Sequence, residues 1–440
     1  MLDVFEDNLL GFRNHLRFHD GELVVDGVSC ADLAERYGTP LYVLSERRIR
    51  ENYRRFHDAL ATSYPNVLVC PAYKANSHLA VCRLYEMEGA GAEVVSQVEL
   101  RLALDAGVAA ERIVFNGPVK KKADLELAIS SDLDLINADS FSELDCMQEA
   151  ARRVGKRCNV GIRVNIGIAP KTHPHLTTAL REDKFGVWMG DAVTAYNEAA
   201  KRDQLNVIGM HSHIGSNLNE PNVMSEMSRT VFGLANMVNA ETGLRLSKID
   251  VGGGLGFPYE PTSPKMSCDE YASSILASNT GVLEDLKNPT VVFEPGRAIV
   301  ADAGILLTTV QVVKKQGNVN WAIVDAGMNT FIRPALYGAK HQVLLTKQRR
   351  VEQTRYSIGG PCCESGDTFG KDVALPTLRE DDLLAILDVG AYGFTMSNNY
   401  NGHARPAVVL IAQHEGQLIR RRETYEEMIA DEIIPSELTK

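Results

Sequence analysis

Short apolar runs alternate with longer segments of helical periodicity between residues 38 and 302. In the longer segments, such as Val98–Ala106 and Lys122–Ser130, apolar residues recur at the spacing of one helix face. Eight strand–helix units in roughly 250 residues are typical of a (β/α)8 barrel. The eight runs that predict its strands are Val67–Cys70, Val94–Ser96, Ile113–Phe115, Leu135–Asn137, Val160–Asn165, Val207–His213, Ile249–Val251 and Val291–Glu294.

Polar or glycine-rich residues follow nearly every one of these runs. Because they would lie at the carboxyl ends of parallel strands, they predict an active site on that face of the barrel. The segments are Lys74–Asn76, Asn116–Pro118, His213–Ser216, Gly252–Gly256 and Glu294–Arg297.

The pattern changes after about residue 303, where strand-like runs follow one another without long helices. This predicts a separate, mostly antiparallel β domain over 303–440, a sandwich or barrel, that ends in a charged helix over Ile419–Ile434. Residues 1–37 contain hairpin-like turns and are expected to join that β domain. The fold class is therefore α/β, with a TIM-like (β/α)8 barrel over 38–302 and an added β domain.

Composition excludes several classes of protein. The 440 residues carry a formal net charge of -11 without a long basic block, which disfavours a nucleic-acid partner. No apolar stretch reaches the roughly 18 residues that span a bilayer, and the first residues are acidic rather than signal-like. Eight cysteines without a CxxC pair indicate reduced thiols, so we expect a soluble cytoplasmic protein.

Lys74 follows a buried apolar strand, where a charged amine is costly to desolvate. A lysine that forms a Schiff base would explain this position, since burial lowers the pKa of an amine and frees its lone pair. The alternative is a lysine that is solvated or ion-paired.

Two other strand ends suggest the contacts of a phosphorylated, nitrogen-containing ring. Gly253 and Gly254 lie in a glycine run whose backbone N–H groups suit a phosphate. Phe257 breaks the G-x-G-x-x-G pattern of dinucleotide-binding loops. The alternative is a simple tight turn that binds no ligand. Glu294, before Pro295 and Gly296, would hold a pyridine nitrogen protonated. A Glu294–Arg297 ion pair that closes the turn is the alternative.

His211 and His213 lie two residues apart and would share one strand face. A metal site lacks a third ligand at an obvious spacing. We therefore favour an imidazole that stacks on a flat cofactor at His213, with His211 as a core histidine.

Two segments of the β domain also carry candidate chemistry. Arg333 and Tyr337 would share a helix face and suit the binding of a carboxylate. Cys363 and Glu364 present a thiol and a carboxylate in a glycine-rich turn, where we favour a proton donor over a metal ligand. The alternative is a buried structural thiol beside a surface acid.

Together these motifs resemble fold-type III pyridoxal-phosphate-dependent decarboxylases, most closely the diaminopimelate decarboxylase family. The likeness runs from about Gly38 to Pro435. Glu93 departs from it, since aspartate is more usual there. The segments that carry it are Ala72–Asn76, Lys171–Pro174, His213–Ser216, Gly252–Gly256, Glu294–Arg297, Ile332–Tyr337, Cys363–Asp367, Gly390–Gly393, Asn398–Asn401 and Arg422–Tyr425.

The resemblance implies pyridoxal 5'-phosphate as the cofactor and assigns a role to each matching residue. Lys74 would bind the aldehyde, His213 would stack on the ring and Glu294 would pair with the ring nitrogen. The phosphate would contact Ser216, Gly253, Gly254, Gly296, Arg297 and Tyr392. The substrate would contact Arg297, Arg333, Tyr337, Glu364 and Tyr392, and no metal is implied.

The resemblance also implies a reaction and an assembly. The family removes CO2 from the D-centre of meso-2,6-diaminopimelate to give L-lysine, the last step of lysine biosynthesis. Cys363 and Glu364 would come from the second subunit of a homodimer, so the active site would be shared. The alternatives are decarboxylation of ornithine, lysine or arginine, and a non-catalytic regulatory protein on the same barrel. A lid over Ala169–Leu180 is a further expectation.

Overall fold

The computed structural model describes residues 10–168, 181–260 and 262–439. The chain divides into two compact units. We call residues 49–258 and 262–300 the barrel unit, and residues 1–48, 259–261 and 301–440 the β unit. The expected segment Lys171–Pro174 and the expected lid Ala169–Leu180 lie outside the described residues.

The barrel unit contains all eight strands that the apolar runs predict. They pair in parallel in the order β5-β13-β12-β11-β9-β8-β7-β6. The main chain of Gly91 and Glu93 donates to the carbonyls of Val69 and Pro71, which joins β6 to the end of β5 and closes the ring. The strands are β5 (Val67–Val69), β6 (Ala92–Val94), β7 (Ile113–Phe115), β8 (Leu135–Ala138), β9 (Cys158–Asn165), β11 (Leu205–His211), β12 (Lys248–Asp250) and β13 (Thr290–Phe293), with β10 (Val187–Trp188) beside β9.

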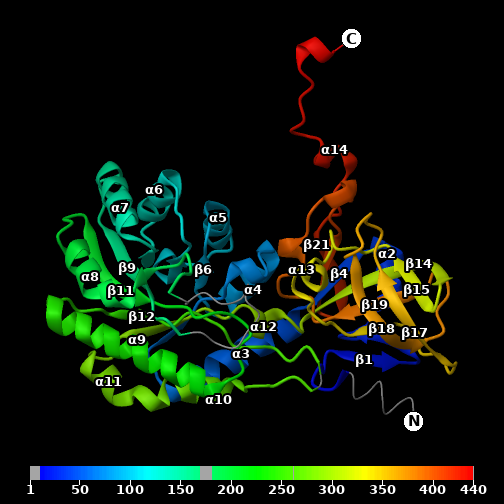
Figure 1. Ribbon diagram of the computed structural model, residues 1–440, viewed down its shortest axis with the longest axis horizontal. Coiled ribbons are helices and arrows are strands. Elements are labelled where there is room, and N and C mark those ends of the chain that lie inside the picture. The colour runs from blue at the N-terminus through cyan, green and yellow to red at the C-terminus, as the bar shows by residue number, and fades with distance from the viewer. Residues whose placement is uncertain (1–9, 169–180, 261, 440) are drawn as a thin grey trace. The chain divides into compact units, whose positions relative to one another are not determined.

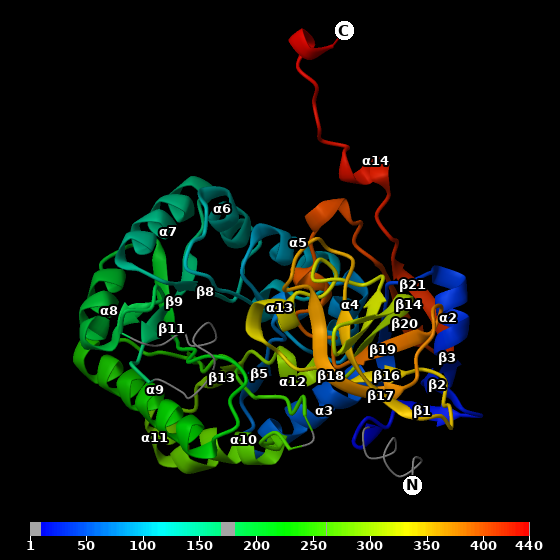
Figure 2. The same ribbon diagram turned by 45° about the vertical axis from the view of Figure 1, so that its right-hand side comes forward.

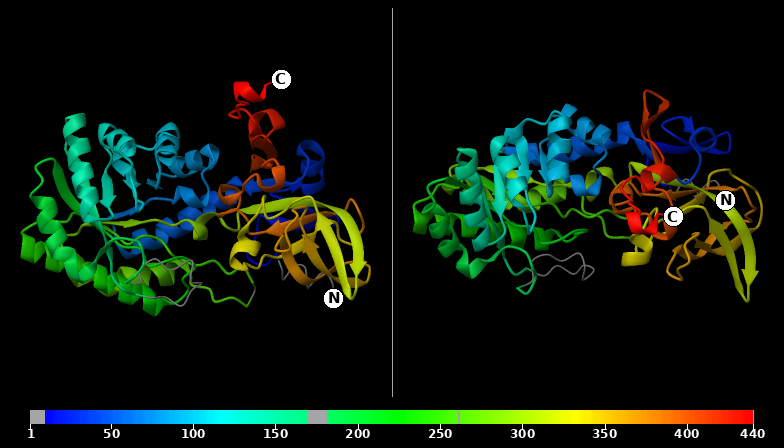
Figure 3. Two further views of the ribbon diagram at one scale, coloured as in Figure 1. Left: turned by 45° about the horizontal axis from the view of Figure 1, so that its top comes forward. Right: turned by 90° about the horizontal axis from the view of Figure 1, so that it is seen from above.

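Helices lie outside these strands, as the cyan and green segments in Figure 1 and Figure 3 show. Several begin at a side-chain cap, because Ser96 and Ser140 each accept a hydrogen bond from the third residue of the helix that follows. The helices are α3 (Glu46–Ser63), α4 (Leu79–Met87), α5 (Gln97–Asp105), α6 (Lys122–Ser130), α7 (Phe141–Val154), α8 (Ala192–Ala200), α9 (Pro221–Thr242), α10 (Cys268–Ile275), α11 (Thr280–Asp285) and α12 (Arg297–Val300).

The interior of the barrel is filled by side chains. Leu68, Val114, Leu135 and Val292 form one buried apolar cluster with Cys70. The neighbouring strand carries Gly161, where a Cβ atom would lie 2.1 Å from the Asn137 side-chain oxygen. The Asn137 side chain therefore occupies the space that a side chain at position 161 of β9 would need.

The β unit is built on a second sheet, whose strands are labelled in Figure 2. The strand order is β18-β17-β15-β14-β4-β20-β21, with β19 paired to β14 and β16 paired to β19. Most neighbours are antiparallel, whereas β4–β20 and β15–β17 are parallel. The strands are β4 (Leu41–Ser45), β14 (Gly304–Gln316), β15 (Val319–Val324), β16 (Val343–Leu345), β17 (Gln353–Gly359), β18 (Thr368–Pro376), β19 (Leu383–Leu387), β20 (Ala407–Ala412) and β21 (Glu415–Arg420).

Two boundary predictions differ from the structure. The barrel was expected to begin at residue 38, but β4 belongs to the second sheet, because it pairs with both β14 and β20. The terminal helix expected over Ile419–Ile434 is also wrong. Ile419 and Arg420 finish β21, and α14 spans only Tyr425–Met428. Ile433 is 85% exposed, so a longer helix there would have no apolar packing to stabilise it.

The N-terminal residues form a small separate sheet of β1 (Leu16–His19), β2 (Glu22–Val25) and β3 (Val28–Ser29), followed by α2 (Cys30–Tyr37). Leu23 donates its N–H to the carbonyl of Thr346, which ties this small sheet to the rest of the β unit. Leu23 and Val25 share one apolar cluster with residues of β4, β14 and β20.

Candidate active site

Lys74 lies in a single helical turn, Tyr73–Ala75, that follows β5 at the carboxyl end of the barrel strands. Tyr73 and Ala75 are buried and anchor the turn. The Lys74 amine is 2.5 Å from a carboxylate oxygen of Glu93, and the side chains of the two residues are 41% and 1% exposed. The amine is therefore ion-paired and also accessible to a molecule that enters this end of the barrel.

Glu93 is the acidic partner of Lys74 and lies in β6. Burial raises the pKa of Glu93, and the positive charge of Lys74 opposes this rise. Burial also raises the pKa of the nearby Glu99 to about 7. Carboxyl groups whose pKa is raised toward neutrality accept and release protons readily, which suits a site where an amine must lose its proton.

Glu294 follows β13 and occupies the same interior. Its Oε1 accepts a hydrogen bond from Asn116 Nδ2 at 2.5 Å, and the same Asn116 nitrogen lies 3.2 Å from Glu93 Oε1. Asn137 Nδ2 donates to Asn116 Oδ1 at 2.8 Å and so fixes the amide orientation. A continuous hydrogen-bonded path therefore runs from Lys74 through Glu93 and Asn116 to Glu294.

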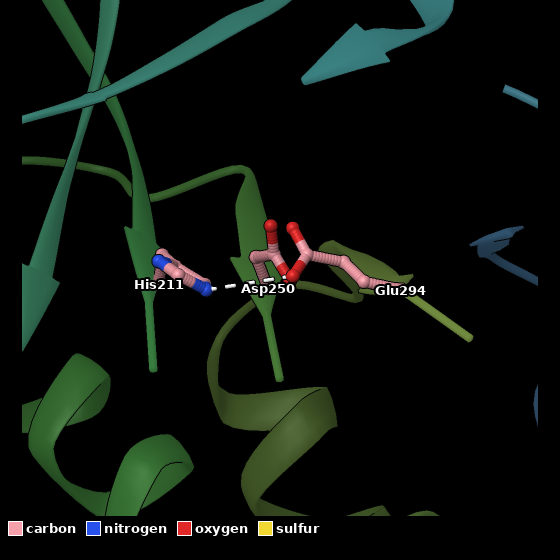
Figure 4. Close-up of side chains that lie close together, drawn as sticks. All are labelled: His211, Asp250 and Glu294. Carbon is pink, nitrogen blue, oxygen red and sulfur yellow. Dashed lines mark ion pairs between the residues drawn. The ribbon is translucent and has the colours of Figure 1, made fainter. Parts of the chain in front are cut away.

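The surroundings of Glu294 keep it ionised. Burial opposes its ionisation, but His211 and Lys74 outweigh this effect and hold its pKa well below the usual range. His211 Nε2 lies 3.7 Å from Glu294 Oε2. Figure 4 shows these two side chains with Asp250, which extends from the end of β12.

His211, Asp250 and Glu294 each offer one ligand atom, and these atoms lie within 4.8 Å of one another. Among the described residues they form the group whose geometry could hold a metal ion. It joins His211 to two carboxyl groups and does not include His213.

His213 contacts the glycine loop. The N–H of Gly253 donates to His213 Nδ1 at 3.3 Å. Burial, with Arg163 and Lys74 nearby, lowers the pKa of His213 to about 3, so the ring is neutral at pH 7. A neutral, flat ring of this kind suits contact with the face of another ring.

The glycine loop itself has no room for side chains. A Cβ atom on Gly253 would lie 2.1 Å from the carbonyl oxygen of Glu294, and Gly254 has a φ of +115° that other residues rarely adopt. Nearby, Arg297 Nη2 donates to Ser216 Oγ at 3.2 Å. The sequence-predicted phosphate contacts Ser216, Gly253, Gly254 and Arg297 therefore all come from the loops that follow β11, β12 and β13.

In the β unit, Arg333 and Tyr337 begin and end the short helix α13, as their spacing predicted. Arg333 is buried, and its guanidinium lies 4.7 Å from the centre of the Tyr259 ring. His341 Nδ1 lies 2.8 Å from the Leu387 carbonyl oxygen. Because a carbonyl oxygen only accepts, Nδ1 carries the proton and donates it to this hydrogen bond. His341 Nε2 therefore accepts a hydrogen bond from Arg333 at 2.9 Å. These contacts fix the direction of the guanidinium.

The turn after β17 displays Cys363 and Glu364, which are both exposed. Asp367 holds the turn from inside, because its carboxylate accepts from the N–H groups of Cys362 and Met328. The N–H of Cys363 donates to Asn401 Oδ1 at 2.7 Å. Tyr392, also of the β unit, has a φ of 56°, which is rare for a bulky residue and fixes its backbone direction.

Sequence reasoning assigned no chemical role to several polar residues of the barrel interior. Glu93 was noted only as a departure from the usual aspartate, and Asn116, Asn137, Arg163 and Asp250 received no role. Each lies within or directly after a buried strand, and four of them are less than 6% exposed. A polar residue near the carboxyl end of an apolar barrel strand is the signal that would have found them.

These residues fit pyridoxal phosphate. Lys74 supplies an accessible amine, and Glu294 supplies a buried carboxylate kept ionised. Gly253 and Gly254 pack against the neighbouring loops without room for a side chain, and their bare backbone N–H groups are of the kind that suits a phosphate.

Comparison with known proteins identifies the family. Residues 46–301 match the family described as "Pyridoxal-dependent decarboxylase, pyridoxal binding domain". Diaminopimelate decarboxylase of Methanocaldococcus jannaschii is 40% identical, over 95% of this chain and 97% of the relative. The enzyme of Pseudomonas aeruginosa is 41% identical, over 94% and 98%.

A solved structure gives the same result. The crystal structure of the M. jannaschii enzyme in co-complex with L-lysine superposes with a TM-score of 0.92 at 38% identity and covers 97% of this chain and 99% of that one. The chain therefore belongs to the pyridoxal-dependent decarboxylases, and within them to the diaminopimelate decarboxylase family.

Proposed function

We propose that this protein decarboxylates meso-2,6-diaminopimelate at its D-centre and releases L-lysine and CO2. The observation that supports this most directly is the hydrogen-bonded path from Lys74 through Glu93 and Asn116 to Glu294. It places an accessible amine and an ionised carboxylate inside one barrel, the two groups that a pyridoxal enzyme uses to hold the cofactor's aldehyde and its ring nitrogen.

Bound pyridoxal phosphate supplies an electron sink for the electron pair that CO2 leaves behind. Lys74 would hold the aldehyde end, and Glu294 would hold a proton on the ring nitrogen. His213 would cover one ring face. Ser216, Gly253, Gly254, Gly296, Arg297 and Tyr392 would hold the phosphate.

The reacting carbon must then receive a proton. Two groups of this chain are candidates for the donor: Lys74, with Glu93 as its acidic partner, and Cys363. Glu93 is suited to exchange a proton with Lys74, because its carboxylate lies 2.5 Å from the amine and burial raises its pKa.

Binding of the distal carboxylate would select the substrate. We assign this role to Arg297, Arg333 and Tyr337, with Glu364 and Tyr392 as further substrate contacts. Ornithine, lysine and arginine have no distal carboxylate, and their cationic tails would repel an arginine at that position. A fixed Arg333 therefore favours meso-diaminopimelate over basic amino acids.

Substrate preference tests this assignment. We expect the purified enzyme to release CO2 from meso-diaminopimelate and to act much more slowly on L-ornithine. Arg333→Met should raise the KM for meso-diaminopimelate about 10- to 100-fold, the loss expected for a hydrogen bond between charged groups. Arg355→Met removes an exposed arginine of the same unit and should leave KM unchanged. Faster turnover of L-ornithine would contradict the assignment.

We also propose that the enzyme acts as a homodimer with shared sites. The turn that carries Cys363 and Glu364 is held rigid by Asp367, yet both side chains face outward from their own unit. An ordered turn that presents a thiol and a carboxylate outward is suited to complete a site on a second copy.

Mixing two inactive variants tests the shared site. Lys74→Ala and Cys363→Ala proteins should each lose most activity. After unfolding and refolding together, random pairing should restore about a quarter of the normal activity, because half of the dimers then contain one intact site. Each variant refolded alone is the control. Failure of the mixture to recover activity would place both groups in the same subunit.

We propose the cytoplasm as the location. All eight cysteines are free of disulfides, which is typical of a reducing compartment. In the described part of the chain, every helix is too short or too polar to cross a bilayer.

A further inference from the structure

Asp250 is the last residue of β12 and is completely buried. Its Oδ1 accepts a hydrogen bond from the N–H of Gly252 at 2.9 Å. Its Oδ2 has no hydrogen-bond donor among the described residues. Figure 4 shows this carboxyl group beside that of Glu294.

Two buried carboxylates side by side cannot both stay ionised without a large cost, because each oxygen is only an acceptor and the charges repel. One shared proton removes both problems, since a neutral carboxylic acid donates a hydrogen bond to its ionised neighbour. Glu294 has Asn116 and His211 beside it, whereas Asp250 has one backbone N–H. The proton therefore belongs on Asp250.

The electrostatics of the pair agree with this placement. Burial and the charge of Glu294 raise the pKa of Asp250 well above its ordinary value. The pKa of Glu294 moves the other way. The other titratable and charged groups that face the pair are His211 of β11, His213 after β11, Arg163 of β9, Glu93 of β6, Lys74 and Cys70 after β5, and Tyr271 of α10.

We propose that Asp250 is a positioning residue. Its carboxyl O–H donates a hydrogen bond to the Glu294 carboxylate, and this bond fixes the orientation and the single negative charge of Glu294. This inference rests on the proposed function only in assigning Glu294 to the cofactor ring nitrogen. The proton shared between Asp250 and Glu294 exists before cofactor or substrate binds.

Two substitutions at Asp250 distinguish a role of its hydrogen-bond donor from a role of a negative charge. Asp250→Asn keeps an oxygen that accepts from Gly252 and supplies an amide N–H that donates to Glu294. Asp250→Leu has a similar volume and no donor. Asp134→Asn is the matched control, because it also removes a buried carboxyl group but lies before β8, at the opposite end of the barrel strands.

The first measurement uses the protein without cofactor. Infrared difference spectra between wild type and Asp250→Asn should contain the carbonyl band of a protonated carboxyl group at pH 7, and isotopic labelling of aspartate should shift it. The same band should persist when Asp134→Asn is compared with the Asp134→Asn, Asp250→Asn double variant. Absence of the band would overturn the proposal, even if the enzyme decarboxylates meso-diaminopimelate normally.

The second measurement is the affinity for pyridoxal phosphate itself. We expect Asp250→Asn to bind it within about threefold of wild type and Asp250→Leu to bind it about 10- to 100-fold more weakly, as for a lost hydrogen bond to a charged group. Equal weakening in both variants would show that the charge of Asp250 matters instead. Stoichiometric metal in the purified protein that Asp250→Asn removes would also overturn the proposal.

Discussion

Replacement of Lys74 by alanine is expected to abolish both turnover and the visible absorbance of covalently bound pyridoxal phosphate. The Lys74 amine is accessible at the carboxyl end of the barrel strands and lies 2.5 Å from a carboxylate oxygen of Glu93. Loss of the group that binds the aldehyde and moves protons should lower kcat by at least about 10²- to 10⁴-fold. Absorption spectra and CO2 release measure the two effects directly.

Two controls make this result specific to Lys74. Lys121→Ala removes an exposed lysine of the same unit and should retain both the spectrum and the activity. In Lys74→Ala, Glu93 loses its cationic neighbour, so its pKa should rise further. A group whose pKa is higher in the folded state favours folding at low pH, so the variant should lose stability as pH rises. Retention of the spectrum and turnover by Lys74→Ala would refute the proposed site.

Replacement of Glu294 by glutamine should produce the second large effect. The carboxylate would no longer hold a proton on the cofactor's ring nitrogen, which weakens the ring as an electron acceptor. We expect kcat to fall about 10²- to 10³-fold, as for the loss of other preorganised electrostatic contacts. Pyridoxal phosphate should still attach to Lys74, so the visible absorbance should remain while turnover falls.

Glu88→Gln is the comparison for Glu294→Gln. Glu88 is also a nearly buried carboxylate, but it pairs with Arg50 and Arg54 and follows α4. Its replacement should lower the free energy of unfolding and leave kcat unchanged. If Glu294→Gln kept normal kcat, the ring nitrogen would need another partner, and the role assigned to Glu294 would be wrong.

Much of the fold follows from local sequence pattern. The eight barrel strands were predicted because a parallel strand buried on both faces appears as a short, continuous apolar run. The position of Lys74, His213, Gly253 and Glu294 at one end of the barrel followed from the same pattern, because each comes directly after such a run. The residues that the family resemblance assigned to cofactor and substrate were not visible from periodicity alone.

The parts that sequence missed depend on contacts between distant residues. β4 has the same apolar character as a barrel strand, and only its partners β14 and β20, which lie more than 250 residues later, place it in the second sheet. The proton of Asp250 is a similar case. Its chemistry is set by Glu294, which is 44 positions away in the chain and adjacent in space.

The pairing of β4 has a consequence for synthesis of the chain on the ribosome. Leu41–Ser45 emerges early and is entirely buried in the finished protein, but its two neighbours are Gly304–Leu307 and Ala407–Ile411. Every strand of the barrel is therefore translated before either edge of this segment finds its hydrogen-bonding partner. Until then an apolar strand with two open edges remains available for wrong pairing, so the nascent chain should depend on chaperones more than the barrel alone would.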